Sequence, residues 1–370
     1  MFFIFLITAL LCYWCGVVYI SNRLQQAAGN SPATLRKSIS LLSIIVGIMP
    51  FILFALRYTR IPDHAYSNIF NGFCVLMILV FYMSLAMLLL DGMKRFLFPN
   101  LKYRVLYAAL FATTLLAKGY NNHMHPQINR IGIATEKVVA GDTLTIVAAS
   151  DFHLGYATGK GRLKELVDII NAENPDIILI AGDLIDNSLK PLYEENMHEE
   201  LNQLRAPLGI FMAPGNHEYI SGIEESRRFL ERTGIHLIAD SSIKAGKGVE
   251  IICRDDASNR GRLPLEILAA RAGSGNFTIL VDHQPREISI KDSLGIDLQI
   301  SGHTHNGQVW PGNIIVDQLF EQSNGYRKWY HSHVYVSSGL SLWGPPIRIG
   351  TKGDIGVFNI YSTNKDSIRK

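Results

Sequence analysis

Long apolar runs fill the first third of the chain and are separated by short polar segments. A helix needs roughly 20 apolar residues, with about 17 as the lower limit, to cross a bilayer core of about 30 Å. Three runs meet this requirement, and a fourth is marginal because Lys102 and Arg104 leave it a short apolar core. The pattern predicts an all-α transmembrane region of about four helices over residues 1–118. The four runs are residues 1–20, 39–56, 69–90 and 101–117.

Two of these runs have a second interpretation. The fourth can cross if its basic side chains extend toward the headgroups, or it can lie along the membrane surface as an interfacial helix. The first run could instead be a cleaved signal peptide. It has no basic residue before its apolar core and no convincing small-residue cleavage site, so we expect a retained helix.

Lysine and arginine are unevenly distributed among the connections between the runs. The first and third connections are basic, whereas the second holds only Arg57 and Arg60. Because basic loops tend to stay in the cytoplasm, the first and third connections are expected inside. With four spans, the part of the chain after residue 118 is then extracytoplasmic, which is the orientation we expect. Without the fourth span, the same rule leaves it in the cytoplasm.

Two polar segments border the rest of the chain. Residues 119–143 are polar and irregular, and we interpret them as a juxtamembrane linker leading into an edge strand near residues 131–139. Residues 363–370 form a polar tail. A separate domain is therefore expected over residues 144–362.

Within this domain, short apolar runs of strand type alternate with segments of helical periodicity. Leu163, Leu166, Val167 and Ile170, for example, recur at the spacing of a helix packed on one side. The later strands follow one another with less helix between them, which predicts two stacked sheets flanked by helices, a four-layer αββα sandwich of the α/β class. The predicted strands are residues 144–149, 177–181, 208–213, 236–239, 250–253, 277–281 and 296–300.

Five of the predicted strands end in loops that are rich in nitrogen and oxygen ligands. Open α/β sheets gather their sites at the carboxyl ends of their strands, so we expect these loops to meet. Two histidines separated by one residue, as in the last loop, can point toward one metal site. The loops are Asp151-Phe152-His153, Gly182-Asp183-Leu184-Ile185-Asp186, Gly215-Asn216-His217-Glu218, Asp282-His283 and Gly302-His303-Thr304-His305.

Composition narrows the function classes only slightly. A formal charge of +3 is too small to indicate nucleic-acid binding. Three of the four cysteines lie inside apolar runs, and Cys253 stands alone, so a thiolate metal site or a disulfide framework is not indicated. Cys12 and Cys15 are read as small apolar residues on one face of a membrane helix.

Taken in order, the five motifs resemble those of the calcineurin-like metallophosphoesterases at every motif position, over roughly residues 144–360. The sequences at residues 282–285, 302–308 and 343–348 resemble a membrane-associated bacterial branch, whose relatives include phosphodiesterases and UDP-2,3-diacylglucosamine pyrophosphatases of lipid A synthesis. Usual members of that branch have glycine where Asn306 stands, which is beside the ligands and not among them. The resemblance says nothing about the amino-terminal helices.

The resemblance implies two divalent metal ions, with Mn, Fe or Zn suited to the mixed ligands. A carboxylate can bridge two ions that lie about 3.5 to 4 Å apart, and by resemblance Asp183 is that bridge. The resemblance also implies that the hydroxide between the metals attacks phosphorus. The ligands implied for one metal are Asp151, His153 and His305, and those for the other are Asn216, His283 and His303.

By the same resemblance, His217 contacts the phosphate and assists the leaving group, and Asp186 orients the ring of His217. An oriented imidazole can stabilise charge or donate a proton. The alternative role of Asp186 is a helix cap, for which Asn187 and Ser188 would serve equally well.

The sequence thus predicts a membrane-anchored phosphoesterase in a bacterial cell membrane. We expect it to hydrolyse a phosphodiester or pyrophosphate bond of a membrane lipid or envelope precursor, with no nucleic-acid partner. Two alternatives stay open: a non-catalytic membrane sensor or scaffold that binds a phosphorylated ligand, and a phosphoesterase acting on soluble nucleotides or phosphomonoesters. Oligomeric state has no signal in the sequence.

Overall fold

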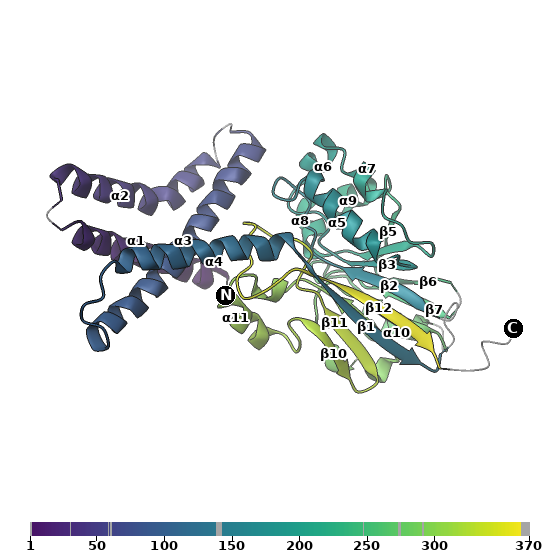
Figure 1. Cartoon of the computed structure of the whole chain (residues 1–370). Coiled ribbons are helices and arrows are strands. Elements are labelled where there is room, and N and C mark those ends of the chain that lie inside the picture. The colour runs from purple at the N-terminus through teal and green to yellow at the C-terminus, as the bar shows by residue number, and fades with distance from the viewer. Residues whose placement is uncertain are drawn as a thin grey trace. The chain divides into compact units, whose positions relative to one another are not determined.

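The computed structural model describes residues 2–29, 31–57, 59, 61–137, 143–246, 248–272, 275–290 and 292–363 (Figure 1). The chain divides into two compact units, Met1–Asn121 and Asn122–Lys370. The first is helical. The second contains all the described strands and the ligand-rich loops.

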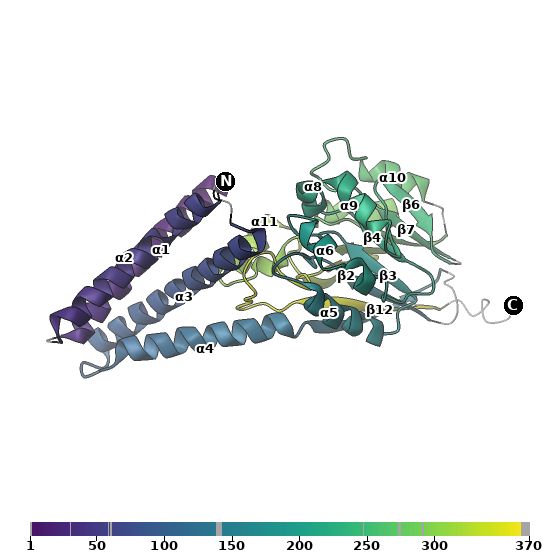
Figure 2. The same ribbon diagram turned by 90° about the horizontal axis from the view of Figure 1, so that it is seen from above.

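The amino-terminal unit consists of long helices, of which α1 and α2 pack side by side (Figure 2). Three segments are long and apolar enough to cross a membrane: Ile7–Ala28, Ala33–Leu56 and Asp63–Phe96. The expected fourth helix forms, but α4 is not among these candidate spans. The helices are α1 (Phe2–Ala28), α2 (Ala33–Leu56), α3 (Asp63–Phe96) and α4 (Arg104–Met124).

Hydrogen bonds from α1 reach α2 at the turn of the helix that precedes Pro50. Proline has no N–H, so Pro50 leaves the carbonyl of Val46, four residues earlier, without its helical donor. The hydroxyl of Tyr13 on α1 donates to this carbonyl at 2.5 Å, and Nε1 of Trp14 donates to the next one, that of Gly47, at 2.8 Å. Because a bilayer core offers no water to backbone groups, the Tyr13 bond satisfies a carbonyl that would otherwise be costly to expose, and the Trp14 bond adds a second link between the helices.

Asp91 joins three helices at one end of this unit. Its carboxylate on α3 accepts a hydrogen bond from Tyr19 of α1 at 2.6 Å and pairs with Arg23 of α1 at 2.7 Å. Arg104, at the start of α4, pairs with the other oxygen. Asp91 lies within a candidate membrane span, where a charged side chain is tolerated when it is paired. Its carboxylate thus links α3 to both α1 and α4.

The second unit contains two six-stranded sheets. In the first sheet the order is β1 (Gln127–Thr135), β12 (Asp354–Ser362), β2 (Leu144–Ala149), β3 (Ile177–Ala181), β4 (Ile210–Ala213) and β5 (Ile235–Leu237). In the second it is β10 (Gly325–Trp329), β11 (Ser332–Val336), β9 (Leu298–Ser301), β8 (Phe277–Val281), β7 (Val249–Cys253) and β6 (Ser241–Lys244).

Parallel pairing sets the direction of the strands that carry the motifs. In the first sheet β2, β3 and β4 are parallel neighbours, and in the second β7, β8 and β9 are parallel neighbours. The carboxyl ends within each set therefore lie at one edge of their sheet, which is where the ligand-rich loops begin.

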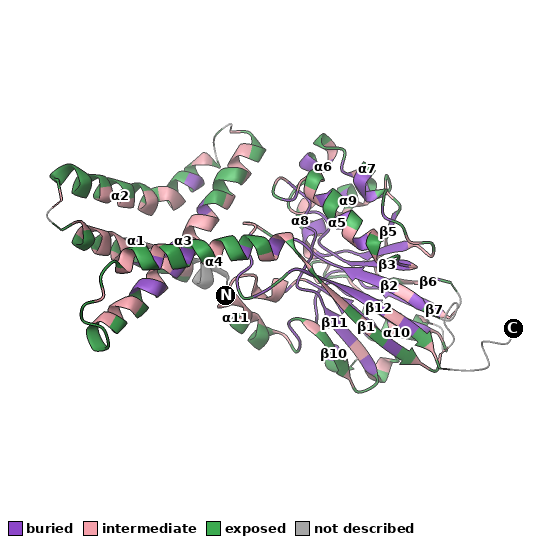
Figure 3. Ribbon diagram, viewed as in Figure 1, coloured by how far each residue is buried: buried purple, intermediate pink, exposed green. Residues whose placement is uncertain are grey.

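Successive residues along the strands of the first sheet belong to two different cores, and the strands are mostly buried (Figure 3). On β2, Ile146 and Ala148 face the second sheet and pack with residues such as Tyr335, whereas Val147 and Ala149 face the covering helices. A smaller cluster packs α10 against the other side of the second sheet. The predicted αββα layering is confirmed. The helices of this unit are α5 (Lys160–Ala172), α6 (Lys190–Glu194), α7 (His198–Leu201), α8 (Asn216–Ser221), α9 (Ile223–Leu230), α10 (Leu265–Arg271) and α11 (Gly312–Leu319).

Residues 119–143, expected to be an irregular linker leading into an edge strand near residues 131–139, contain the end of α4 and an earlier-starting strand. Helix α4 continues to Met124, and β1 already begins at Gln127, directly after Pro126. Strand β1 pairs in parallel with β12 along its whole length, so tertiary pairing outweighs the polar composition. Residues 138–142, the end of the expected edge strand, and residues 364–370 of the expected tail lie outside the described residues.

Candidate metal centre

The ligand-rich loops after β2 and β3 are connected through their backbones. The N–H of Asp151 donates to the carbonyl of Gly182 at 3.1 Å, and the N–H of His153 donates to the carbonyl of Asp183 at 3.0 Å. The backbone around the site is also unusual, because a left-handed conformation is uncommon for residues other than glycine and often marks functional sites. Positive φ angles occur at Asp151, His153, Asp183, His303 and His305.

A first group of ligand-type atoms comes from the loops after β2 and β9. Nε2 of His305 lies 3.3 Å from Oδ1 of Asp151 and 3.1 Å from Nε2 of His153. Nε2 of His153 in turn lies 3.7 Å from Oδ1 of Asp151. The atoms of these three residues are close enough to hold one metal ion.

A second group comes from the loops after β3, β4, β8 and β9. Nε2 of His283 lies 3.1 Å from Oδ2 of Asp183 and 3.2 Å from Oδ1 of Asn216. Nδ1 of His303 lies 2.9 Å from the same Asn216 oxygen. Oδ2 of Asp183 is also 3.9 Å from Nε2 of His153, so this one oxygen lies between the two groups. The fold thus brings together all seven residues expected to bind metal.

Neighbouring groups hold each ligand so that one lone pair faces inward. The backbone N–H of His303 donates to both carboxylate oxygens of Asp151, at 3.1 Å to Oδ2 and 3.3 Å to Oδ1, and Oδ1 also faces the first group. Asp183 uses Oδ1 to accept the backbone N–H of His217 at 2.9 Å, which leaves Oδ2 between the groups. Nδ1 of His283 lies 2.7 Å from the carbonyl oxygen of Ala181, so Nδ1 carries the proton and Nε2 faces inward.

This arrangement fits metal ions and would be unfavourable without positive charge. The inward lone pair of His283 faces the acceptor oxygens of Asp183 and Asn216, and acceptors that close repel one another unless a cation lies among them. Carboxylate, imidazole and amide together form the donor set that divalent Mn, Fe and Zn accept.

The pKa values of the histidines show which positions favour a positive charge. Burial lowers the pKa of His303 to about 4, with the charge of His283 adding to the effect, and it lowers the pKa of His305 to about 3. Burial opposes protonation of His153 as well, but hydrogen bonds to Asp151 and Asp186 raise the pKa of His153 to about 10. The carboxylates therefore favour a positive charge at their centre, whether a proton or a metal ion.

His217 lies beside the first group. Its Nδ1 is 2.9 Å from the carbonyl oxygen of Asp186 and 3.4 Å from that residue's Oδ1. Burial lowers the pKa of His217, but the carboxylates of Asp186 and Asp183 outweigh it and raise the pKa above its usual value. His217 also lies close enough to His153 and Asp183 to form a third ligand group with them. Since Nδ1 is held by Asp186, Nε2 is the nitrogen left for a substrate or a metal.

Residues 144–307 match the family described as calcineurin-like phosphoesterases. An uncharacterized metallophosphoesterase of Aquifex aeolicus is 30% identical over 243 residues, which cover 63% of this chain and 91% of that protein. The chain belongs to this family.

Other relatives of this metallophosphoesterase match its helical segment or are named as transmembrane proteins. An uncharacterized metallophosphoesterase of Campylobacter jejuni is 28% identical over 97% of this chain and 98% of its own length, so the match includes the amino-terminal helices. A Danio rerio protein named as a transmembrane protein with a metallophosphoesterase domain is 31% identical over 68% of this chain and 62% of its own. The protein is thus a metal-dependent phosphoesterase, a hydrolase, with helices suited to a membrane.

Glu218 supports the metallophosphoesterase site, although the sequence motif that contains it indicated no role for it. Its buried carboxylate accepts backbone N–H groups from three positions: Asp183 at 2.9 Å, Gly215 at 2.7 Å and Ile185 at 3.0 Å. It therefore fixes the loop after β3 to the loop after β4. Its place beside Asn216 and His217 was the available signal, but only the fold shows which N–H groups it accepts.

Arg348 is a second supporting residue of the metallophosphoesterase. Its side chain is fully buried, and its guanidinium donates to the carbonyls of Ser338, Gly339 and Ser341 at 2.6, 2.9 and 2.7 Å. It also donates to the carbonyl of His305 at 3.3 Å. Arg348 thus fixes the loop after β9 from the protein interior, and its buried side chain does not line an open surface.

Two glycines of the motifs are required by close approach. A Cβ atom added to Gly215 would collide with Oδ1 of Asp183, and one added to Gly302 would collide with Ser150 and with Oδ2 of Asp151. Both glycines lie where two ligand loops touch, so any side chain there would separate the ligands.

An exposed apolar helix, α11, follows the loop that carries His303 and His305. Ile314, Ile315 and Leu319 on α11 are 47%, 46% and 61% exposed, and Trp310 just before the helix is 39% exposed. The ring of Phe320, at the end of α11, lies 6.1 Å from that of His303. We call Trp310, Ile314, Ile315 and Leu319 the α11 surface.

Proposed function

We propose that this metallophosphoesterase hydrolyses a phosphodiester or pyrophosphate bond in a membrane lipid or an envelope precursor of a bacterial cell membrane. The observation that carries the proposal is the position of Asp183 Oδ2 between two convergent groups of ligand atoms. A single carboxylate oxygen shared by two groups is the arrangement that a two-metal hydrolytic centre needs.

In this proposal, Asp183 would serve both metal ions, for which Mn, Fe or Zn would suit the donor set. Asp151, His153 and His305 would hold one ion, and the remaining proposed ligands would hold the other, namely Asn216, His283 and His303. When bound, the two cations supply positive charge that lowers the pKa of water and attracts the phosphate oxygens. Asn216 is neutral, so the second site keeps more of that positive charge for the substrate.

His217 is proposed to act on the leaving group. Its backbone N–H is held by Asp183 and its Nδ1 by Asp186, so the ring has one orientation. Nε2 can then donate a proton to the leaving oxygen or stabilise charge on the phosphate. Asp186 is proposed as the residue that orients the ring, through its backbone carbonyl and, at longer range, its carboxylate.

The α11 surface supports a lipid over a soluble nucleotide. It places exposed isoleucine, leucine and tryptophan side chains directly after the loop that carries His303 and His305. Exposed apolar residues gathered beside a catalytic site often contact a membrane or an apolar ligand. A nucleotide or a simple phosphomonoester would leave this surface unused.

The side of the membrane depends on α4. The three candidate spans support a three-span arrangement, and the basic connections then place the catalytic unit in the cytoplasm. Four spans would place it outside, as expected from the apolar runs alone. Labelling a single cysteine at an exposed position such as Glu224, in intact cells with an impermeant maleimide, separates the two arrangements.

The central test is hydrolysis by the purified full chain with added Mn²⁺. We expect turnover of an aryl phosphodiester that is abolished by chelation and by Asp183→Asn. A panel of lipid phosphodiesters, lipid pyrophosphates, nucleotides and phosphomonoesters then assigns the substrate class. Preference for the soluble compounds would overturn the lipid proposal, and hydrolysis that survives chelation would overturn the metal centre itself.

A further inference from the structure

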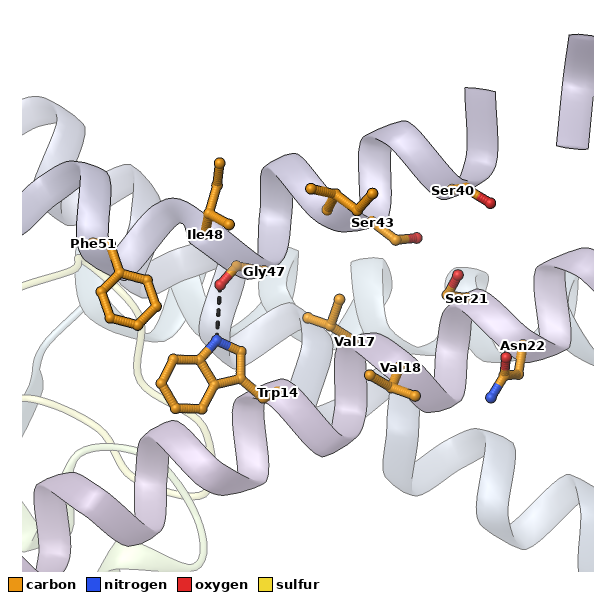
Figure 4. Close-up of a pocket in the computed structure, with 11 residues that line it drawn as sticks. Trp14, Val17, Val18, Ser21, Asn22, Ser40, Ser43, Gly47, Ile48 and Phe51 are labelled. Carbon is orange, nitrogen blue, oxygen red and sulfur yellow. Dashed lines mark hydrogen bonds between the residues drawn. The ribbon is translucent and has the colours of Figure 1, made fainter. Parts of the chain in front are cut away.

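A groove lies between α1 and α2, far along the sequence from the metal ligands. Its volume is about 540 Å³, within the range of small-molecule sites (Figure 4). One end is apolar, with Trp14, Ile48 and Phe51, and the opposite end carries the polar side chains of Ser21 and Ser40, as Figure 4 shows. The lining thus changes from apolar to hydrogen-bonding along its length.

The polar end lies on the side of the short connection between α1 and α2. At a rise of 1.5 Å per residue, Ser21 is about 10 Å from the end of α1 at Ala28, in the last third of the candidate span Ile7–Ala28. Gln25 donates to the carbonyl of Arg36 and to Oγ of Ser40, both at 2.9 Å, and holds this end together.

Basic residues adjoin the polar end. Arg36 is one helical turn before Ser40, so the two lie on the same face of α2. Lys37 follows Arg36 in the sequence. Both basic side chains are exposed. The residues that line the groove include no acid. The polar end is therefore suited to a negatively charged group.

We propose that the α1–α2 groove binds an anionic membrane phospholipid. The phosphate is placed near Arg36, Lys37 and Ser40. One acyl chain follows the groove past Val17 and Ile48 toward the apolar end. A lipid is the occupant that fits, because α1 and α2 both have the length and composition of membrane spans. The positive charge at the rim favours an anionic headgroup over a neutral one.

Gly47 offers a way to fill the groove without damaging the helix packing. It lines the groove, and a Cβ atom at this position would meet no atom within 4 Å, so a leucine side chain can extend into the open space. Its carbonyl would still accept Nε1 of Trp14, since the backbone is unchanged. Gly72 on α3 is the matched control, because it is also open and does not line the groove.

The experiment uses the full chain in nanodiscs of phosphatidylcholine with phosphatidylglycerol, followed by release into mild detergent and native mass spectrometry. We expect the wild type and Gly72→Leu to retain one phosphatidylglycerol, and Gly47→Leu to retain it at least about tenfold less often. The double variant Arg36→Gln/Lys37→Gln should retain lipid but lose the preference for phosphatidylglycerol over phosphatidylcholine.

Retention that is equal in all variants would overturn the proposal. The proposal would also be overturned if the wild type were released as a dimer and Gly47→Leu as a monomer, because the groove would then hold a second copy of the chain. If Gly47→Leu does not yield folded protein, the Arg36 and Lys37 variant still decides the matter, since both side chains are exposed. Loss of hydrolysis does not enter this readout, so the result is independent of the proposed function.

Discussion

The backbone carbonyl of Asp186, and not its carboxylate, makes the shorter contact with His217: Nδ1 lies 2.9 Å from the carbonyl oxygen and 3.4 Å from Oδ1. The same Oδ1 lies 3.4 Å from Nδ1 of His153. The carboxylate of Asp186 is therefore shared between a residue proposed to act on the substrate and a residue proposed to bind metal.

Because the Asp186 carboxylate contacts both histidines, we expect Asp186→Ala to affect both kcat and metal binding. The carbonyl that holds His217 remains, so we expect kcat to fall by about tenfold or less, whereas His217→Ala should lose roughly a hundredfold or more. Because His153 loses a partner, Asp186→Ala should also weaken metal binding, by roughly 10- to 100-fold. Hydrolysis of an aryl phosphodiester across a Mn²⁺ titration measures both effects. Equal losses of kcat in the two variants would assign the orienting role to the carboxylate.

Asp183→Asn should remove both metals and not only one. An amide oxygen is neutral and a poor bridge, and Oδ2 of Asp183 is the atom between the two ligand groups. We expect metal content, measured on the purified protein by inductively coupled plasma mass spectrometry, to fall from two ions toward none, and hydrolysis to fall with it. Asp168→Asn, an exposed aspartate on α5, is the control. A variant that keeps one tightly bound ion would contradict the bridging role.

Glu218→Ala should destabilise the catalytic unit and loosen the metal site. It would leave three buried backbone N–H groups without their acceptor, at a cost of about 1–3 kcal/mol for each unsatisfied group. Thermal unfolding of the detergent-solubilised chain, with and without Mn²⁺, measures the loss. The exposed Glu224→Ala on α9 is the comparison and should change little. An unchanged unfolding temperature would show that the loops hold without Glu218.

The α11 surface should matter for lipid and not for soluble substrate. Ile315→Ser with Leu319→Ser removes exposed apolar contacts without touching a proposed ligand, so hydrolysis of a soluble aryl phosphodiester should stay the same. The KM for a lipid phosphodiester presented in mixed micelles should rise by roughly tenfold. Ile267→Ser, a similarly exposed residue on α10, should leave both activities unchanged. Parallel losses on both substrates would point to a packing role for α11.

The sequence by itself determined the layer order of the catalytic unit and which residues gather in its centre. Short apolar runs placed strands at β2, β3, β8 and β9, and parallel neighbouring strands end at one edge of a sheet, so side chains that follow those strands meet. Long apolar runs likewise indicated the membrane helices, because length and composition alone decide whether a helix can cross.

Only the tertiary structure decided how the ligands are held. The bonds from Glu218 to the Asp183 loop, from Arg348 to the His305 carbonyl and from Tyr13 to the carbonyl freed by Pro50 join residues far apart in sequence, and local patterns carry no signal for such pairs. The same holds for the linker expected after residue 118. The sequence indicated an irregular linker that leads into an edge strand near residues 131–139. Pairing with β12 starts that strand earlier, at Gln127, because backbone hydrogen bonds to a neighbouring strand outweigh weak local preference.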